Sequence, residues 1–175
     1  IHTGKGPKLL ENNSRPGDPE IQNLLPILKD DFVDVCFKML DGSLTRAEFE
    51  ENATVVTYKA PSAYGGYMEA FPECVDLSRT RNPVDLSQAY KLKKKYGDRI
   101  RVYPGSMELR DKETYALGSR TVCVVGIGDT IQEAREISLE GVRAIRGGSL
   151  WHRTDIASRE HIEKSIRHME KLRTQ

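Results

Sequence analysis

An acid, an amide and a guanidinium alternate along the chain close to its start, at Glu11, Asn13 and Arg15. In an extended strand, residues two apart point to the same face, so these three side chains would converge on one spot. Carboxylate and amide oxygens are ligands that suit Mg²⁺, and the planar fork of an arginine fits a pair of phosphoryl oxygens. The spacing therefore predicts a site for a metal ion and a phosphate, as phosphoryl transfer requires.

The residues around this motif predict the elements that would position it. We expect a short strand over residues 7–10 and a turn over 14–18, where Ser, Pro, Gly and Asp gather. Asp18 and Pro19 are typical of a helix start, with Asp18 as the N-cap and Pro19 at the first helical position. The helix should end near Leu25, because a proline follows it.

The rest of the chain predicts an α+β fold. A mainly antiparallel sheet is expected, with helices on one side, because several strands are joined by short turns. Residues 61–83 form a long stretch without a regular pattern, which is typical of a functional loop. The predicted elements are a helix over 30–40, strands over 53–58, 99–103, 113–117 and 121–125, a helix over 86–96, and helices after Thr130 and Ser158.

Hydrophobic periodicity assigns an apolar, inward face to three of these helices. The residues expected to point inward are Phe32, Val33, Cys36, Phe37 and Leu40 in the first, Ile131, Ala134, Ile137, Val142 and Ile145 in the second, and Ile162, Ile166, Met169 and Leu172 in the third.

Composition limits the class of protein. The 175 residues carry a formal net charge of +1, which gives no reason to expect nucleic acid or a membrane as a partner. No apolar run approaches the roughly 20 residues that span a bilayer, and residues 1–6 lack a signal-peptide core. Cys36, Cys74 and Cys123 fit neither a disulfide framework nor a zinc site, so a reducing cytoplasm is the expected location.

The arrangement of residues 11–26 resembles the last catalytic strand of the ATP-grasp ligases. It is similar to the pattern E-x-N-x-R-F-G-D-P-E-x-Q of the phosphoribosylamine–glycine ligase family, also called glycinamide ribonucleotide synthetases. The chain departs from that family at Pro16, at 62–67 and at Ala157. Further similar stretches follow in the family's order, at 53–56, 102–106, 118–122, 128–134 and 151–156.

This resemblance implies a magnesium-dependent or manganese-dependent ligase that uses ATP to join glycine to 5-phosphoribosylamine. Glu11 and Asn13 would ligate the metal, and Arg15 would steady the transferring phosphoryl group. Asp18 and Arg120 are candidates for binding substrate or phosphate, although a helix cap and a surface turn explain them equally well.

The resemblance also implies two domains and a missing partner. Residues 1–50 would end the ATP-grasp catalytic domain, and 51–175 would form the C-terminal α+β domain. The family's adenine pocket, its phosphate-binding lysines and its other metal-binding acid precede this stretch. We therefore expect an upstream part to complete the enzyme, in the same chain or in another.

Two other functions stay open from the sequence: a non-catalytic binding or oligomerisation module, and another ATP-grasp carboxylate–amine ligase. Several further patterns have structural explanations. The glycines at 126–129 lack the Lys-Ser/Thr of a P-loop, the lysines at 91–95 suit a solvated helix face, and His161 and His168 suit a surface. We expect residues 151–153 to pack the C-terminal domain.

Overall fold

A four-stranded antiparallel sheet forms the centre of the structure, a computed structural model that describes residues 1–12, 14–61, 64–65 and 83–174. The strand order is β4-β7-β3-β8. Strand β3 pairs with β7 through Ala53↔Gly128 to Lys59↔Val122, and with β8 through Lys59↔His152 to Pro61↔Leu150. The bounds are β3 Ala53–Pro61, β4 Ile100–Pro104, β7 Val122–Gly128 and β8 Leu150–His152.

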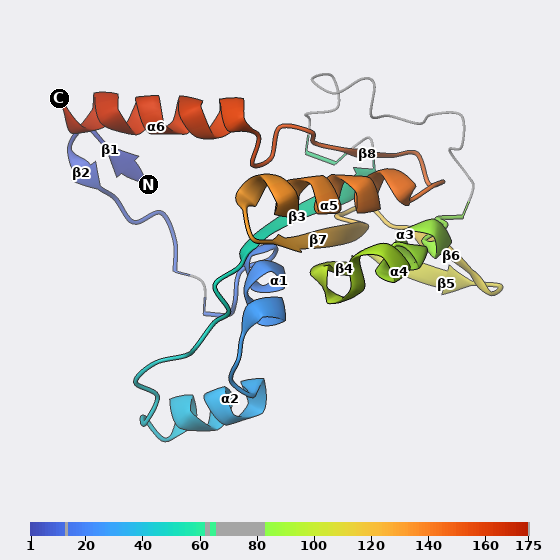
Figure 1. Ribbon diagram of the computed structural model, residues 1–175, viewed down its shortest axis with the longest axis horizontal. Coiled ribbons are helices and arrows are strands. Elements are labelled where there is room, and N and C mark those ends of the chain that lie inside the picture. Colours follow the sequence, from blue (N-terminus) through green and yellow to red (C-terminus); the bar gives the residue numbers. More distant parts are fainter. Residues whose placement is uncertain (13, 62–63, 66–82, 175) are drawn as a thin grey trace.

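Helices and a hairpin surround this sheet, which confirms the predicted α+β class (Figure 1). Helix α5 packs along β7 and β3, with α3 beside it, while α1 and the 3₁₀ turn after it lie on the opposite face. The remaining bounds are β1 His2–Thr3, β2 Gly6–Pro7, α1 Glu20–Leu24, a 3₁₀ turn Leu25–Ile27, α2 Phe32–Leu40, α3 Ser87–Lys91, α4 Lys93–Tyr96, a 3₁₀ turn Gly97–Arg99, β5 Met107–Arg110, β6 Glu113–Ala116, α5 Ile131–Ala144 and α6 Arg159–Arg173.

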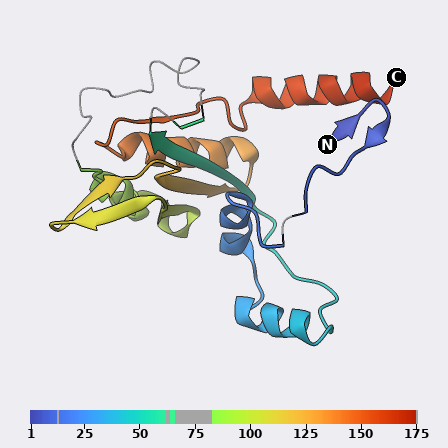
Figure 2. The ribbon, with the colours of Figure 1, turned by 180° about the vertical axis from the view of Figure 1, so that it is seen from behind.

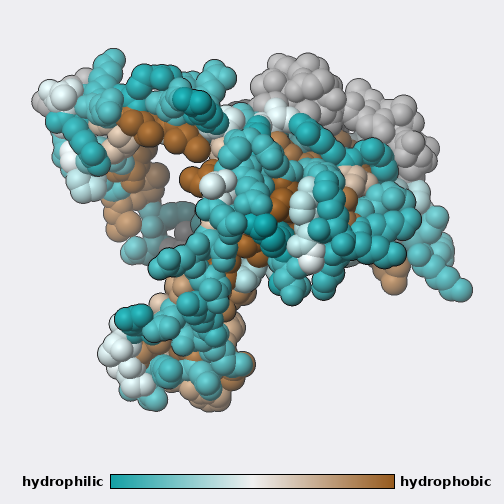
Figure 3. All heavy atoms as spheres, viewed as in Figure 1, coloured by the Kyte–Doolittle hydropathy of each residue, from teal (hydrophilic) through white to brown (hydrophobic). Residues whose placement is uncertain are grey.

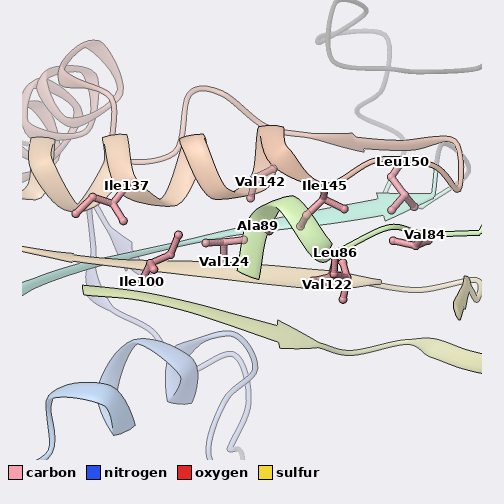
Figure 4. Packing of buried hydrophobic residues seen from close by; sticks show 10 residues of the cluster. All are labelled: Val84, Leu86, Ala89, Ile100, Val122, Val124, Ile137, Val142, Ile145 and Leu150. Carbon is pink, nitrogen blue, oxygen red and sulfur yellow. The ribbon is translucent and has the colours of Figure 1, made fainter. Parts of the chain in front are cut away.

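The main hydrophobic core lies between α5, α3 and the sheet (Figure 4). Side chains alternate along β7, so Val122 and Val124 enter this core while Cys123 and Val125 enter a second cluster on the other face. The seven residues of β7 are buried, as expected for a central strand covered on both faces. The core residues are Val84, Leu86, Ala89, Ile100, Val122, Val124, Ile137, Val142, Ile145 and Leu150.

Helix α5 approaches β7 closely because its contact with the strand is made by small residues. A Cβ added to Gly126 would collide with the Ala134 carbonyl oxygen and would lie 2.7 Å from the Ser138 backbone nitrogen. The Ser138 hydroxyl, fully buried, donates to the Val124 carbonyl oxygen (2.8 Å) and lies 2.9 Å from the Thr57 hydroxyl oxygen. These contacts fix which face of β3 turns toward α5.

Most predicted elements of the α+β body are confirmed. The Thr130 side chain accepts from the Glu133 backbone nitrogen at the start of α5, and the Ser158 side chain accepts from the His161 nitrogen at the start of α6. The helix expected over 86–96 divides into α3 and α4. Strands β5 and β8 were not predicted. The irregular stretch 61–83 lies largely outside the described residues.

The prediction of a strand over 7–10 is wrong. Strand β2 ends at Pro7, where its pairing with β1 ends, and residues 8–12 form no strand. Leu9 and Leu10 are each 76% exposed, so no apolar face holds this segment in register. Glu11 and Arg15 therefore do not share a strand face here, and Asn13 lies outside the described residues.

The prediction that Asp18 caps the first helix is also wrong. Pro19 occupies the N-cap position of α1, and no side chain caps the helix. The Asp18 carboxylate instead accepts hydrogen bonds from side chains of α1 and β3. The end of α1 is close to the prediction, since a 3₁₀ turn containing Pro26 replaces the helix after Leu24.

Two predicted inward faces are largely exposed. Only Val35 of α2 is buried, while Phe37 and Leu40 are 62% and 84% exposed. No residue of α6 is buried, and Ile166 is half exposed. In α5 the inward face is confirmed except at its first residue, Ile131. Figures 1 and 2 show the reason, because α2 and α6 project away from the sheet.

None of the helices in the part of the chain that the structure describes is both long and apolar enough to cross a membrane.

The close approach of α5 to β7 predicts a sensitive position. Gly126→Ala should lower the free energy of unfolding by about 2 kcal/mol or more, because neither the strand nor the helix backbone can move without opening the core. Urea denaturation monitored by circular dichroism measures this. Gly118→Ala is the matched control, since a Cβ there meets open space. Equal losses in the two variants would contradict the packing argument.

Candidate functional site

A pocket of about 360 Å³ lies on the face of the sheet opposite α5. Residues 56, 58 and 60 of β3 form its floor, because they alternate with Thr57, whose hydroxyl contacts α5. The wall is completed by Pro19 just before α1, by residues 64 and 65 after β3, by the turn before β7 and by the end of β8 with the residues after it. The lining residues are Pro19, Val56, Tyr58, Ala60, Tyr64, Gly65, Arg120, Trp151, His152, Arg153 and Ile156.

Asp18 joins three elements at the edge of this pocket. Its Oδ1 accepts hydrogen bonds from the Tyr58 hydroxyl (2.8 Å) and from Gln22 Nε2 (3.1 Å). Its Oδ2 lies 3.2 Å from Arg120 Nη2, and its backbone carbonyl accepts from Arg120 Nη1 (2.5 Å). The guanidinium also lies over the Tyr58 ring, 5.4 Å from its centroid. Asp18 and Arg120 are thus in direct contact, although 102 residues separate them.

Tyr58 acts in this network as a donor. Burial raises the pKa of the Tyr58 hydroxyl well above its usual value, with the nearby Cys123 thiol and the Asp18 carboxylate adding to the shift. The hydroxyl therefore keeps its proton at neutral pH and can donate it to Asp18. Burial likewise raises the pKa of the Cys123 thiol, beside it on β7, to about 11. The pocket floor is consequently uncharged under physiological conditions.

A second arginine of the pocket is also held by a carboxylate. Arg153 donates from Nε to Asp155 Oδ1 (2.8 Å) and from Nη2 to Asp155 Oδ2 (2.6 Å). The Arg153 guanidinium holds the pKa of the Asp155 carboxyl below its usual value. Arg135 of α5 holds this loop in turn, donating to the carbonyl oxygens of Thr154 (2.6 Å) and Ile156 (3.1 Å).

Of the four proposed site residues that the structure describes, it brings two together. Asp18 and Arg120 meet at the pocket, but Glu11 and Arg15 lie in an exposed segment without strand pairing. Arg15 Nη1 donates to the carbonyl oxygen of the adjacent Pro16 (2.8 Å). Asn13 lies outside the described residues, so its prediction as a metal ligand stays a prediction.

Two polar residues of the pocket were not predicted as site residues. The sequence places Tyr58 in a β-branched strand and predicts that residues 151–153 pack the C-terminal domain. Trp151 and His152 are indeed buried, but Arg153 is only partly buried and lines the cavity. The Arg-x-Asp spacing of residues 153 and 155 is a signal that could have indicated an oriented guanidinium.

The described residues contain no group of three or more His, Cys, Asp or Glu side chains that could hold a metal ion. The carboxylate of Glu11 has the chemistry that Mg²⁺ prefers. One acid nevertheless makes an incomplete site, so further ligands would have to come from elsewhere.

Comparison with known proteins defines the class of this fold. Residues 78–159, which include most of the α+β body and the Arg153–Asp155 pair, match the family model described as phosphoribosylglycinamide synthetase, C domain. Residues 78–159 are therefore similar to a domain of that type.

Similarity extends over nearly the whole chain. The chain is 38% identical over 173 residues to the phosphoribosylamine–glycine ligase of Methanocaldococcus jannaschii. This match covers 98% of the chain and 36% of that protein. It is 35% identical over 170 residues to the enzyme of the same name from Methanobrevibacter smithii, and this match covers 97% of the chain and 36% of that protein. It is 38% identical over 161 residues to the enzyme of the same name from Thermococcus kodakarensis, and this match covers 91% of the chain and 33% of that protein.

Along nearly its whole length the chain is similar to the C-terminal portion of phosphoribosylamine–glycine ligases, and residues 78–159 match their C domain. It spans about a third of the length of the curated relatives that it matches.

The buried thiol of Cys123, next to Tyr58 in the sheet, predicts a loss of stability at high pH. An unfolded cysteine titrates near pH 8.5. Because the folded-state pKa of Cys123 is raised to about 11, its stabilising effect is complete below about pH 8.5 and is lost as the pH rises toward 11. Between these two pH values, the free energy of unfolding of the parent chain should fall by up to about 1.4 kcal/mol per pH unit more than that of Cys123→Ala.

Urea denaturation at pH 7 to 10.5 measures this difference. Cys36→Ala is the control, because Cys36 is only partly buried on α2. If Cys123→Ala kept the full pH dependence of the parent chain, titration of this thiol would not be its cause.

Proposed function

We propose that this chain is the C-terminal portion of an ATP-dependent ligase that joins glycine to 5-phosphoribosylamine in purine biosynthesis. The observation that carries the proposal is similarity to ligases of that name across 97% or more of the chain, rather than across one motif. The Asp18–Arg120 contact supports it, because it joins the motif segment and the C domain in one pocket. Such an enzyme would work in the cytoplasm.

The reaction has two steps, each balanced by a leaving group. An oxygen of the glycine carboxylate attacks the γ-phosphorus of ATP, and the bond to ADP breaks to give glycyl phosphate. The amine of 5-phosphoribosylamine then attacks the acyl carbon, an amine proton is lost, and inorganic phosphate leaves. Positioning and neutralisation of charge supply most of the catalysis in such transfers.

The chain's own residues would divide this work between two places. Glu11 and Asn13 would ligate Mg²⁺ or Mn²⁺, which neutralises phosphate charge when bound, and Arg15 would steady the transferring phosphoryl group. At the pocket, Arg120 would bind the substrate phosphate, while Asp18 would orient Arg120 and accept a hydrogen bond from the substrate. Residues 1–50 would close the ATP-grasp domain, and 51–175 would form the C-terminal domain.

Apolar surface supports the proposal that an upstream portion of the enzyme covers this chain. Leu9, Leu10, Phe37 and Leu40 are all more than 60% exposed. Figure 3 shows further apolar side chains on the side of α6 that faces the rest of the molecule. Surfaces of this kind mark protein interfaces. About two thirds of each of these relatives lies outside the part that the chain matches, which is enough to cover these apolar surfaces.

The proposal predicts activity from an assembly of this chain with the upstream two thirds of the Methanocaldococcus jannaschii ligase. The measurement is formation of ADP that depends on both glycine and 5-phosphoribosylamine. Arg15→Gln should lower kcat by roughly a hundredfold, because one donor to the transferring phosphoryl group is lost. Glu11→Gln should raise the Mg²⁺ concentration needed for half-maximal rate.

Glu160→Gln, at an exposed position of α6, is the control and should match the parent assembly. An assembly without turnover would favour the non-catalytic module. Turnover that requires a different carboxylate or amine would favour another ATP-grasp ligase. Unchanged kinetics in both Arg15→Gln and Glu11→Gln would contradict the roles proposed for these residues.

A further inference from the structure

Two arginines approach the same pocket from opposite sides of β3. Arg120 precedes β7 and Arg153 follows β8, and these two strands flank β3 in the sheet. Each guanidinium is partly exposed, with about a third of the Arg120 side chain and 39% of the Arg153 side chain accessible. Both can therefore reach a ligand that enters the cavity between them.

Each guanidinium is oriented in advance by a carboxylate. Asp155 binds Arg153 through two hydrogen bonds, which fixes the plane of the guanidinium, and Arg135 holds the loop that carries both residues. Asp18 binds Arg120 through one carboxylate oxygen and its backbone carbonyl. Ordering these side chains before the ligand arrives lowers the entropy that binding would otherwise cost.

The chemistry of the cavity favours a small phosphate ester. A guanidinium has five N–H donors in a planar fork that matches phosphate oxygens, so two of them suit one phosphate group. The rest of the lining is mainly apolar or aromatic, with Tyr58, Ala60 and Trp151 among the residues that face the cavity. A ligand with a phosphate group at one end and a compact, moderately polar remainder fits a cavity of about 360 Å³.

We propose that Arg153 is the second phosphate-binding residue of this pocket, that it and Arg120 together hold the phosphate of a phosphorylated pentose, and that Asp155 is its positioning residue. The choice of a pentose phosphate rests on the proposed function, whereas the pairing of the two arginines rests on the pocket itself. Arg153 thus acts in ligand recognition and does more than pack the C-terminal domain.

Isothermal titration of the 175-residue chain with ribose 5-phosphate, and separately with ribose, tests this proposal. The parent chain should bind ribose 5-phosphate and bind ribose at least tenfold more weakly, because the phosphate makes the charged contacts. Arg153→Gln should weaken the binding of ribose 5-phosphate by roughly tenfold or more. Arg159→Gln, six residues away and 88% exposed, should bind as the parent does.

Two conservative variants separate recognition from mere loss of structure. Arg153→Lys keeps the charge but not the fork, and it should lose most of the affinity that Arg153→Gln loses. Asp155→Asn removes a negative charge near the ligand, so charge alone predicts tighter binding, whereas a positioning role predicts severalfold weaker binding. Circular dichroism confirms that each variant is folded.

Absence of ribose 5-phosphate binding by the parent chain, or parent-like binding by Arg153→Gln, would overturn the proposal. Tighter binding by Asp155→Asn would overturn the positioning role. If binding follows the prediction but the assembled ligase has no turnover, the proposed function fails while the phosphate pocket stands.

Discussion

The contact between Asp18 and Arg120 is the interaction on which the rest of the site depends. It ties the segment before α1 to the turn before β7, through an ion pair, a backbone hydrogen bond and the shared neighbour Tyr58. The pair is partly exposed, so its Coulomb energy alone is modest. Its importance is geometric, because it places Pro19 and α1 against the face of β3 and so gives the pocket a wall.

The sheet makes this contact possible by presenting a fixed face. Helix α5 meets β7 so closely that Gly126 has no room for a side chain, and Ser138 bridges the helix to both β7 and β3. With Thr57 held toward α5, the alternation of the strand turns Tyr58 to the other face. A half-buried and protonated Tyr58 can then donate to Asp18. The position of the site therefore follows from packing on the opposite side of the sheet.

The sequence predicted the parts of this molecule that are governed by local rules. The cap at Thr130, the cap at Ser158 and the β-branched run of β3 all formed where local chemistry favours them. The strand expected over 7–10 did not form, because a strand needs a neighbour and β2 has only β1. The sequence predicted the apolar faces of α2 and α6, but the described residues do not bury them. Of the site, Asp18 and Arg120 were each named, but their pairing was not, since no local rule joins residues 102 apart.

Hydrogen exchange at α1 tests most directly whether the Asp18–Arg120 contact holds the N-terminal segment on the sheet. The amides of Ile21 and Gln22 donate within the turn that starts α1, to Gly17 (2.9 Å) and Pro19 (3.1 Å). In Asp18→Asn both should exchange at least roughly fivefold faster, as expected for a loss of about 1 kcal/mol of local stability, while the amides of β7 should keep their rates. Unchanged exchange at Ile21 and Gln22 in that variant would show that the segment is held by other contacts, and it would contradict the account given for this site.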